Sequence, residues 1–138
     1  MATIENIERL RAAYKVWHDS KGGRSDAWLD LLSDQVRFRS MGGASPLLAF
    51  ADERRSKVDA VAYFTGLTRD WTMVHWTPET FVSEGDRIAV FGTCAWKHKG
   101  TGKTAEVAIS HLWTFEDGKV VGVTEIFDSA RAVSAATP

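Results

Sequence analysis

The sequence predicts an α+β fold in which three N-terminal helices pack on a curved, mainly antiparallel sheet. Up to about Leu67, apolar side chains recur at the three- and four-residue spacing of amphipathic helices. From Trp71 onward the spacing is two, and β-branched and aromatic residues become frequent, as in strands. Helices that precede a run of strands, rather than alternating with them, indicate helices gathered on one face of an antiparallel sheet.

The first two helices are expected within the first 32 residues. Thr3 is the predicted N-cap of a helix that ends near Lys21. Its inner stripe is expected to be Ile4, Ile7, Leu10, Tyr14 and Trp17. Ser25 is the predicted cap of a short helix over residues 25–32. The side chains of that helix that can face the core are Trp28, Leu29 and Leu32.

The third helix follows a loop over residues 41–55, which holds a possible helical turn at 46–50. Ser56 and Asp59 form a capping box for this helix, which should reach about Leu67. Its inner side is expected to consist of Val58, Val61, Ala62, Phe64 and Leu67.

The sheet is expected to hold a short strand at 34–40 and four longer ones from residue 71 onward. The longer runs cover 71–83, 86–99, 104–115 and 119–127. Pro78 lacks the N–H that a ladder needs, so a bulge or break is expected there. Apolar residues alternate on both faces of some strands, and this pattern predicts a homodimer in which a second copy covers the outer sheet face.

Size and composition narrow the class of protein. The 138 residues suffice for one domain, with a folded part over about 3–129 and a small, polar tail at 130–138 that is frayed or lies on a partner. A net charge of −1 without a basic block argues against nucleic-acid binding. No apolar run approaches the roughly 20 residues of a membrane span, no signal-peptide core is present, and the single Cys94 favours a cytoplasmic setting. No metal-ligand spacing is present, so neither metal nor cofactor is expected.

Three phrases of the sequence, WLDLLSDQVRF, SKVDAVAYF and HLWTFEDGKVVGVTEIFD, carry a family resemblance. They resemble the SnoaL-like branch of the nuclear transport factor 2-like superfamily, which includes polyketide cyclases and has ketosteroid isomerases as relatives. The resemblance implies a cone closed by helices, a pocket inside it, and usually a homodimer. Fold-level likeness does not specify chemistry, so the site residues need their own argument.

The hairpin through Asp117-Gly118 carries the main candidate site. A bulged turn that pairs Phe115 with Lys119 would put the apolar residues of both strands on one face. His111 would then lie opposite Val123, with Glu125 as its diagonal neighbour at roughly 7–8 Å between Cα atoms. The apolar wall should raise the pKa of Glu125 toward the range useful for proton transfer.

The resemblance adds roles for these residues. Polyketide cyclases of the SnoaL type carry a histidine and an acidic acid/base residue at the positions that correspond to His111 and Glu125. Ketosteroid isomerases present a tyrosine where Tyr14 falls, and an aspartate base on the first strand where Arg39 stands here. Because arginine cannot act as a base at ordinary pH, steroid isomerisation by the family mechanism is not expected.

Each candidate also has a structural interpretation. His111 is either a catalytic group or a core histidine that is hydrogen-bonded to backbone. Glu125 is either a base, or a carboxylate that pairs with an arginine or lies where the pocket opens to solvent. Tyr14 is either a second donor or core. Arg39 either points inward, which would suit an anionic or carbonyl-bearing ligand, or is a surface charge. Asp128 is expected to be a cap or interface residue.

The sequence as a whole favours a cofactor-independent acid/base enzyme acting on a small, apolar carbonyl compound, as a cyclase, isomerase or dehydratase. Glu125 would be the acid/base, His111 the oxyanion partner and Tyr14 a possible second donor. The substrate-binding wall would consist of Trp17, Trp28, Phe38, Trp71, Val107, Ile109, Trp113, Val123 and Phe127. The alternatives are a non-catalytic binding module for a hydrophobic ligand or a protein, and a dimerising scaffold whose pocket is filled by its own tryptophans.

Overall fold

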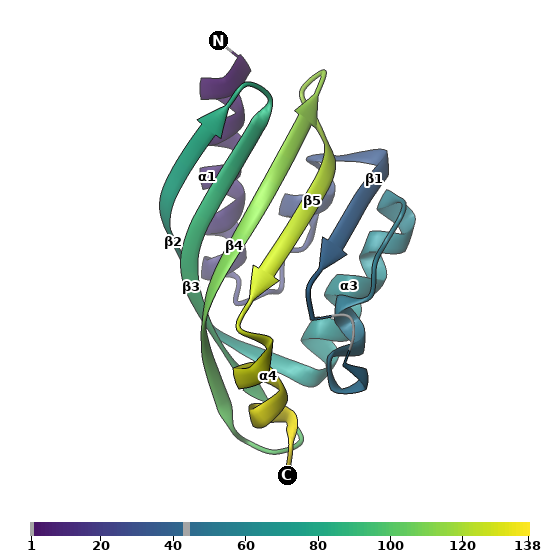
Figure 1. Cartoon of the computed structure of the whole chain (residues 1–138), viewed down its shortest axis with the longest axis vertical. Helices are drawn as coiled ribbons and strands as arrows, with labels where there is room; N and C mark the ends of the chain where they lie inside the picture. The colour runs from purple at the N-terminus through teal and green to yellow at the C-terminus, as the bar shows by residue number, and fades with distance from the viewer. Residues whose placement is uncertain (1, 43–44) are drawn as a thin grey trace.

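One five-stranded sheet, in the order β1-β5-β4-β3-β2, is the framework of the computed structural model, which describes residues 2–42 and 45–138 (Figure 1). The strands are β1 (Leu32–Ser40), β2 (Trp71–Glu84), β3 (Arg87–His98), β4 (Thr104–Glu116) and β5 (Lys119–Phe127). β1 pairs with β5 in parallel, and the other neighbours pair antiparallel. The predicted α+β class with a mainly antiparallel sheet is confirmed.

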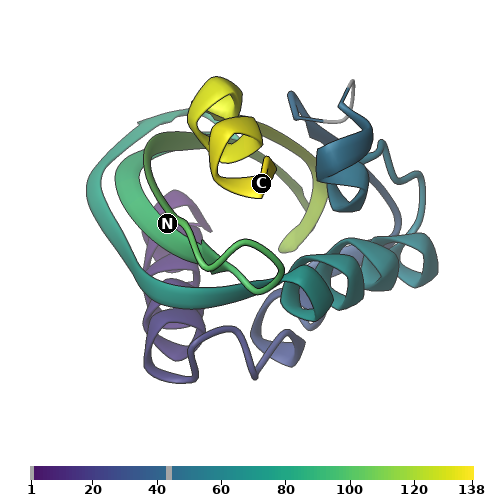
Figure 2. The same cartoon turned by 90° about the horizontal axis from the view of Figure 1, so that it is seen from below.

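The helices close the curved sheet. Their bounds are α1 (Ala2–Asp19), α2 (Asp26–Leu29), the 3-10 helix η1 (Pro46–Ala51), α3 (Lys57–Asp70) and α4 (Ser129–Ala136). Figure 2 shows the sheet curling around an interior, with α1, α2 and α3 closing its open side and α4 lying across the lower end. None of the described helices is long and apolar enough to cross a membrane.

The first two helices differ from expectation at their ends. α1 begins at Ala2, so Thr3 lies inside the helix, and its hydroxyl donates to the Gly85 carbonyl instead of capping. Ile4 is 63% exposed, because the helix passes the edge of the sheet there. α2 is shorter than predicted, and Ser25 makes no side-chain cap bond. Leu32 leaves the helix because it pairs with Val120 as the first residue of β1.

α3 has the predicted capping box but turns a different face inward. The Ser56 hydroxyl accepts the Asp59 N–H at 3.0 Å, and the Asp59 carboxylate accepts the Arg55 N–H at 3.2 Å. The expected inner residues Val58 and Val61 are 85% and 43% exposed. The buried stripe is Ala60, Tyr63, Phe64, Gly66 and Leu67. Positions 60, 63, 64 and 67 have the ideal helical spacing, so small Ala60 lets the helix lie close while the valines face outward.

The β4–β5 hairpin has its bulge one step beyond the turn. Asp117 and Gly118 have φ of 51° and 76°, as a two-residue turn with two left-handed positions requires, and Glu116 pairs with Lys119. The register shifts between the pairs of Thr114 and Phe115. The prediction that Phe115 pairs with Lys119 was therefore wrong, whereas the bulge itself still brings odd positions opposite odd ones.

Two further sequence predictions concern bulges and the chain end. β2 shifts register between Pro78 and Thr80, as the proline indicated.

The predicted tail is wrong, because Ser129–Ala136 forms α4 and packs three alanines inward: Ala132, Ala135 and Ala136. Asp128 caps this helix by accepting the Arg131 N–H at 3.2 Å, which confirms its structural role.

The outer sheet face carries exposed apolar side chains. Phe91, Leu112 and Ile126 are 50%, 38% and 53% exposed. Ser110 pairs with both Phe91 and Ile126, so these two residues stand in one row across β3, β4 and β5. The homodimer through this face stays a prediction.

If a second copy covers this face, a charge at its centre should split the dimer. Phe91→Asp should run as a 15.3 kDa monomer in light scattering after size exclusion, while the unaltered protein runs at twice that mass. Val58→Asp, at the exposed face of α3, is the control and should remain dimeric. A monomeric unaltered protein, or an unchanged Phe91→Asp dimer, contradicts this interface.

Candidate functional site

A cavity of about 70 Å³ lies between the helices and the sheet. Eight of the nine predicted wall residues line it: Trp17, Trp28, Phe38, Trp71, Val107, Ile109, Trp113 and Phe127. Val123 does not line the cavity. It is 2% exposed and pairs with Trp113, so it packs in the core. Phe64, which was expected on the inner side of α3, also lines the cavity. The residues that the sequence did not indicate include Tyr63 from α3, Trp76 from β2, Cys94 and Trp96 from β3, and Ala132 from α4.

His111 and Glu125 meet on the wall of this cavity. They pair directly across β4 and β5, whereas the sequence had placed His111 opposite Val123. The imidazole Nε2 and the carboxylate Oε2 lie 2.7 Å apart, and the two residues are 7% and 4% exposed. The predicted pair is thus closer than expected, because the bulge lies between the turn and these residues.

Glu125 accepts further hydrogen bonds from two elements that pack beside β5. The Ser40 hydroxyl of β1 donates to Oε1 at 2.8 Å, since Ser40 pairs with Glu125 in the parallel ladder. The Tyr63 hydroxyl of α3 lies 2.9 and 3.0 Å from the two carboxylate oxygens, so a single proton is shared between them. No arginine pairs with Glu125 among the described residues, in contrast to one of the alternatives left open by the sequence.

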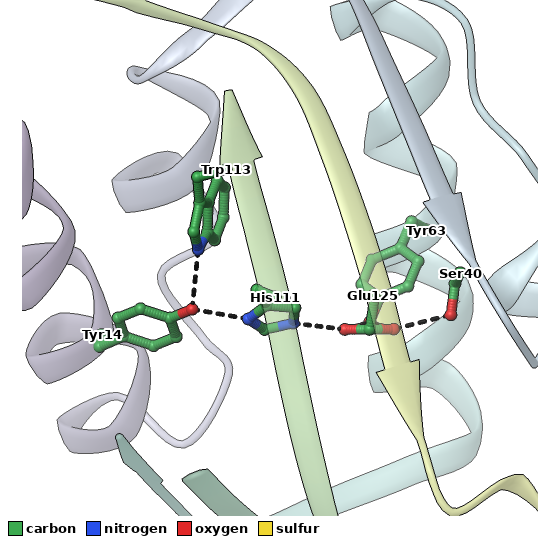
Figure 3. Close-up of polar contacts among 6 residues, drawn as sticks. All are labelled: Tyr14, Ser40, Tyr63, His111, Trp113 and Glu125. Atoms are coloured by element: carbon green, nitrogen blue, oxygen red, sulfur yellow. Dashed lines mark hydrogen bonds and ion pairs between the residues drawn. The ribbon is translucent and has the colours of Figure 1, made fainter. Parts of the chain in front are cut away.

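The other side of the imidazole contacts Tyr14 and Trp113 (Figure 3). His111 Nδ1 lies 2.6 Å from the Tyr14 hydroxyl, and the Trp113 indole N–H donates to that hydroxyl oxygen at 3.0 Å. His111 is therefore a core histidine bonded to side chains rather than to backbone. Tyr14 does not line the cavity: it lies behind His111 and orients the ring.

The donors in this chain determine which atoms carry protons. An indole N–H can only donate, so the Tyr14 oxygen accepts from Trp113. The Tyr14 O–H then finds its acceptor in His111 Nδ1 when that nitrogen carries no proton. The proton of a neutral imidazole is then on Nε2, where it donates to Glu125. A neutral imidazole and an ionised carboxylate thus pair each donor of the chain with an acceptor.

The pKa of Glu125 moves in the direction opposite to the expected one. Burial raises it, but the hydrogen bonds from His111, Ser40 and Tyr63 outweigh burial and hold the pKa of the carboxyl below its ordinary value. Burial raises the pKa of both Tyr14 and Tyr63 well above the usual tyrosine value, and that of the Cys94 thiol to about 12. The sequence suggested a raised carboxyl pKa because it placed His111 only at a diagonal position and gave no sign of Ser40 or Tyr63 as donors to Glu125.

Arg39 lies outside the cavity. It is exposed, and its guanidinium lies 3.4 Å from the Thr124 hydroxyl, so it is a surface charge. The next residue, Ser40, points inward because side chains alternate along a strand. Within residues 2–42 and 45–138, no group of three or more His, Cys, Asp or Glu side chains is placed to hold a metal ion.

Several solved structures share this fold. A nuclear transport factor 2-like protein of unknown function from Burkholderia pseudomallei has a TM-score of 0.83 and 23% identity, covering 96% of this chain and 98% of that one. TerC, co-crystallised with polyporic acid, has a TM-score of 0.80, 23% identity and the same coverage. A candidate SnoaL-like polyketide cyclase from Jannaschia has a TM-score of 0.78 and 17% identity, covering 98% and 94%.

These identities show the fold alone, and no curated protein sequence matches the chain. The family model of the SnoaL-like domain, however, matches residues 10–123, which is most of the chain. The match includes α2, β1, α3, β2, β3, β4 and the first half of β5. It therefore contains His111 and ends two residues before Glu125. The protein belongs to the SnoaL-like domain family.

Proposed function

We propose that this protein is a cofactor-independent acid/base enzyme that moves a proton on a small, apolar carbonyl compound, as an isomerase, cyclase or dehydratase. The observation that supports this is the ionised, buried Glu125 beside His111 on the wall of an otherwise apolar cavity. Buried titratable groups with strong charge or hydrogen-bond partners are frequent at catalytic sites. Relatives of this fold include proteins described as polyketide cyclases and isomerases, which is consistent with proton-transfer chemistry.

Glu125 is the proposed base. Both nitrogens of His111 are engaged, one by Tyr14 and the other by Glu125, so the imidazole has no free lone pair for a substrate. The lowered pKa keeps Glu125 ionised at neutral pH and ready to accept a proton. His111 then positions the carboxylate by holding Oε2, while a proton is taken up at Oε1.

Tyr63 is the proposed donor to the substrate oxygen, a role that the sequence had suggested for His111 and Tyr14. Its side chain lines the cavity, and its O–H is shared between the two carboxylate oxygens. When Glu125 takes up a proton, its negative charge disappears and its hold on the shared hydrogen weakens. The hydroxyl can then turn to the enolate oxygen that develops on the substrate.

A non-catalytic binding module is the second candidate, and the saturated network favours it. Each donor among Tyr14, Ser40, Tyr63, His111 and Trp113 already has a partner within the chain. The cavity of about 70 Å³ is also smaller than the roughly 150 Å³ that binds benzene in an engineered protein. A larger ligand needs some of the aromatic wall to move, whichever candidate is right.

Exchange of α-protons for deuterium in small ketones tests the base without knowledge of the natural substrate. The protein should accelerate exchange of cyclopentanone in D₂O, followed by NMR, and Glu125→Gln should lower the rate roughly 10²–10⁴-fold because an amide cannot accept the proton. Glu106→Gln removes an exposed carboxylate of β4 and is the matched control. Exchange that persists in Glu125→Gln, or no acceleration by the unaltered protein, argues for the binding module.

The two tyrosines separate a donor from a positioning residue. Tyr63→Phe should slow exchange by roughly 10²–10³-fold, the cost of losing one oxyanion donor. Tyr14→Phe should slow it less than about tenfold but lower the free energy of unfolding in urea by roughly 1–3 kcal/mol, since Trp113 and His111 lose their buried partner. The reverse order of the two rate effects would assign the donor role to Tyr14.

The lowered pKa of Glu125 predicts the acid limb of the pH profile. The base is ionised wherever pH exceeds its pKa, so the exchange rate should stay level down to about pH 4.3, the ordinary glutamate value, and fall only below it. The stability that Glu125 contributes is complete above that pH and is lost as pH falls through the lower, folded-state pKa. An acid limb centred near neutrality would show that Glu125 is not the base.

A further inference from the structure

We propose that the indole N–H of Trp71 is a second ligand-binding group of this cavity, which donates a hydrogen bond to an acceptor oxygen or nitrogen of the bound molecule. The ligands concerned carry a carbonyl, ether or nitrile group in addition to their apolar surface. A ligand would be held in this way whether the protein converts it or releases it unchanged.

The indole N–H of Trp71 is buried without a partner. The residue is 3% exposed and lines the cavity, and its Nε1 has no hydrogen-bond acceptor. Within the described part of the chain, the only other buried side-chain nitrogen or oxygen in this state is Nε of Arg54, which does not line the cavity. A buried polar group left unpaired costs roughly 1–3 kcal/mol, so such a donor in a cavity wall points to an acceptor that arrives with a ligand.

The polar groups around Glu125 on this wall have no free donor. The Glu125 carboxylate accepts from Ser40, Tyr63 and His111, and the protons of the latter two are engaged in those bonds. A ligand acceptor that binds any of them must first break a bond within the protein. An acceptor that binds Trp71 breaks no hydrogen bond within the protein, but because Nε1 is itself fully buried, the side chains around it have to move to admit the acceptor.

The surroundings of Trp71 hold the ring but leave its N–H free. The backbone of Trp71 is fixed where α3 meets β2, and its N–H there donates to the Leu67 carbonyl. The His98 ring lies edge-on, with centroids 4.8 Å apart and planes at 80°. His98 Nδ1 is already an acceptor, for the Thr101 N–H, so this lone pair is not available to the indole.

Trp71 lies at a different level of the sheet from Glu125. Glu125 stands in the row of His111 and Val90, whereas Trp71 pairs with His98, eight residues further along β3 than Val90. Together with Phe64, Trp71 also borders a surface groove that includes Ser20, Thr68 and Lys99. The acceptor bound by Trp71 therefore belongs to a part of a natural ligand remote from the carbon next to Glu125, and a probe with one carbonyl reaches Trp71 in a different orientation from the one in which it would react.

The test compares cyclopentanone with methylenecyclopentane, which has the same shape and no acceptor. The Trp71 indole resonance in ¹H–¹⁵N spectra is the one that disappears in Trp71→Phe. Saturating cyclopentanone should move this resonance downfield, and methylenecyclopentane should leave it in place. Trp71→Phe should lower the preference for the ketone, measured as the ratio of the two Kd values, about three- to tenfold. Trp113→Phe removes an indole of equal size from the same cavity wall whose N–H already donates to Tyr14, and it should change both affinities by the same factor.

The resonance in the unaltered protein keeps the test valid even if Trp71→Phe folds poorly. Glu125→Gln should leave the Trp71 shift in place, so failure of the proposed base and failure of this inference can be told apart. A ketone that binds without moving the Trp71 resonance, that binds no better than the hydrocarbon, or that does not bind at all overturns the proposal.

Discussion

The hydrogen bond between His111 and Glu125 is the interaction on which the rest of the cavity depends. A buried carboxylate costs several kcal/mol unless partners replace the water that it loses. Here the partners come from β4, β1 and α3, so the charge can be buried only when these three elements are all in place around β5. The same carboxylate therefore ties the parallel edge strand, the central hairpin and the long helix into one arrangement.

The same bonds limit what the site can do. Each donor that stabilises the ionised form of Glu125 also lowers its basicity, so the carboxylate is available at neutral pH but is a weak base. The shared hydrogen of Tyr63 is the part of the network that can be redirected at least cost, because its two bonds are made with one proton. Catalysis by this cavity would thus consist of a small change in direction of one hydroxyl rather than a rearrangement of the pair.

The six tryptophans explain both the stability of the interior and the small size of the cavity. All six line it, and all are at most 8% exposed, so the pocket wall and the hydrophobic core are the same residues. Trp28 stacks on Trp113 with ring centroids 5.1 Å apart, and Tyr14 lies edge-on to Trp28 at 4.7 Å. The sequence left open whether the tryptophans line a pocket or fill it themselves. In the structure they line a cavity, and their bulk keeps that cavity small.

The sequence by itself determined the class of fold, the order of the elements, and the face of the hairpin on which His111 and Glu125 lie. These follow from local periodicity, because alternation along a strand and helical spacing along a helix depend only on neighbouring residues. Which residues meet across the interior was decided by the tertiary structure alone. Ser40 reaches Glu125 through a parallel strand pairing between residues 85 positions apart in the sequence. Tyr63 reaches it because α3 turns Tyr63, and not the valines that were expected to be buried, toward the interior. The lowering of the Glu125 pKa comes first from His111, its partner across the hairpin, and then from Ser40 and Tyr63, whose long-range contacts no local pattern could have predicted.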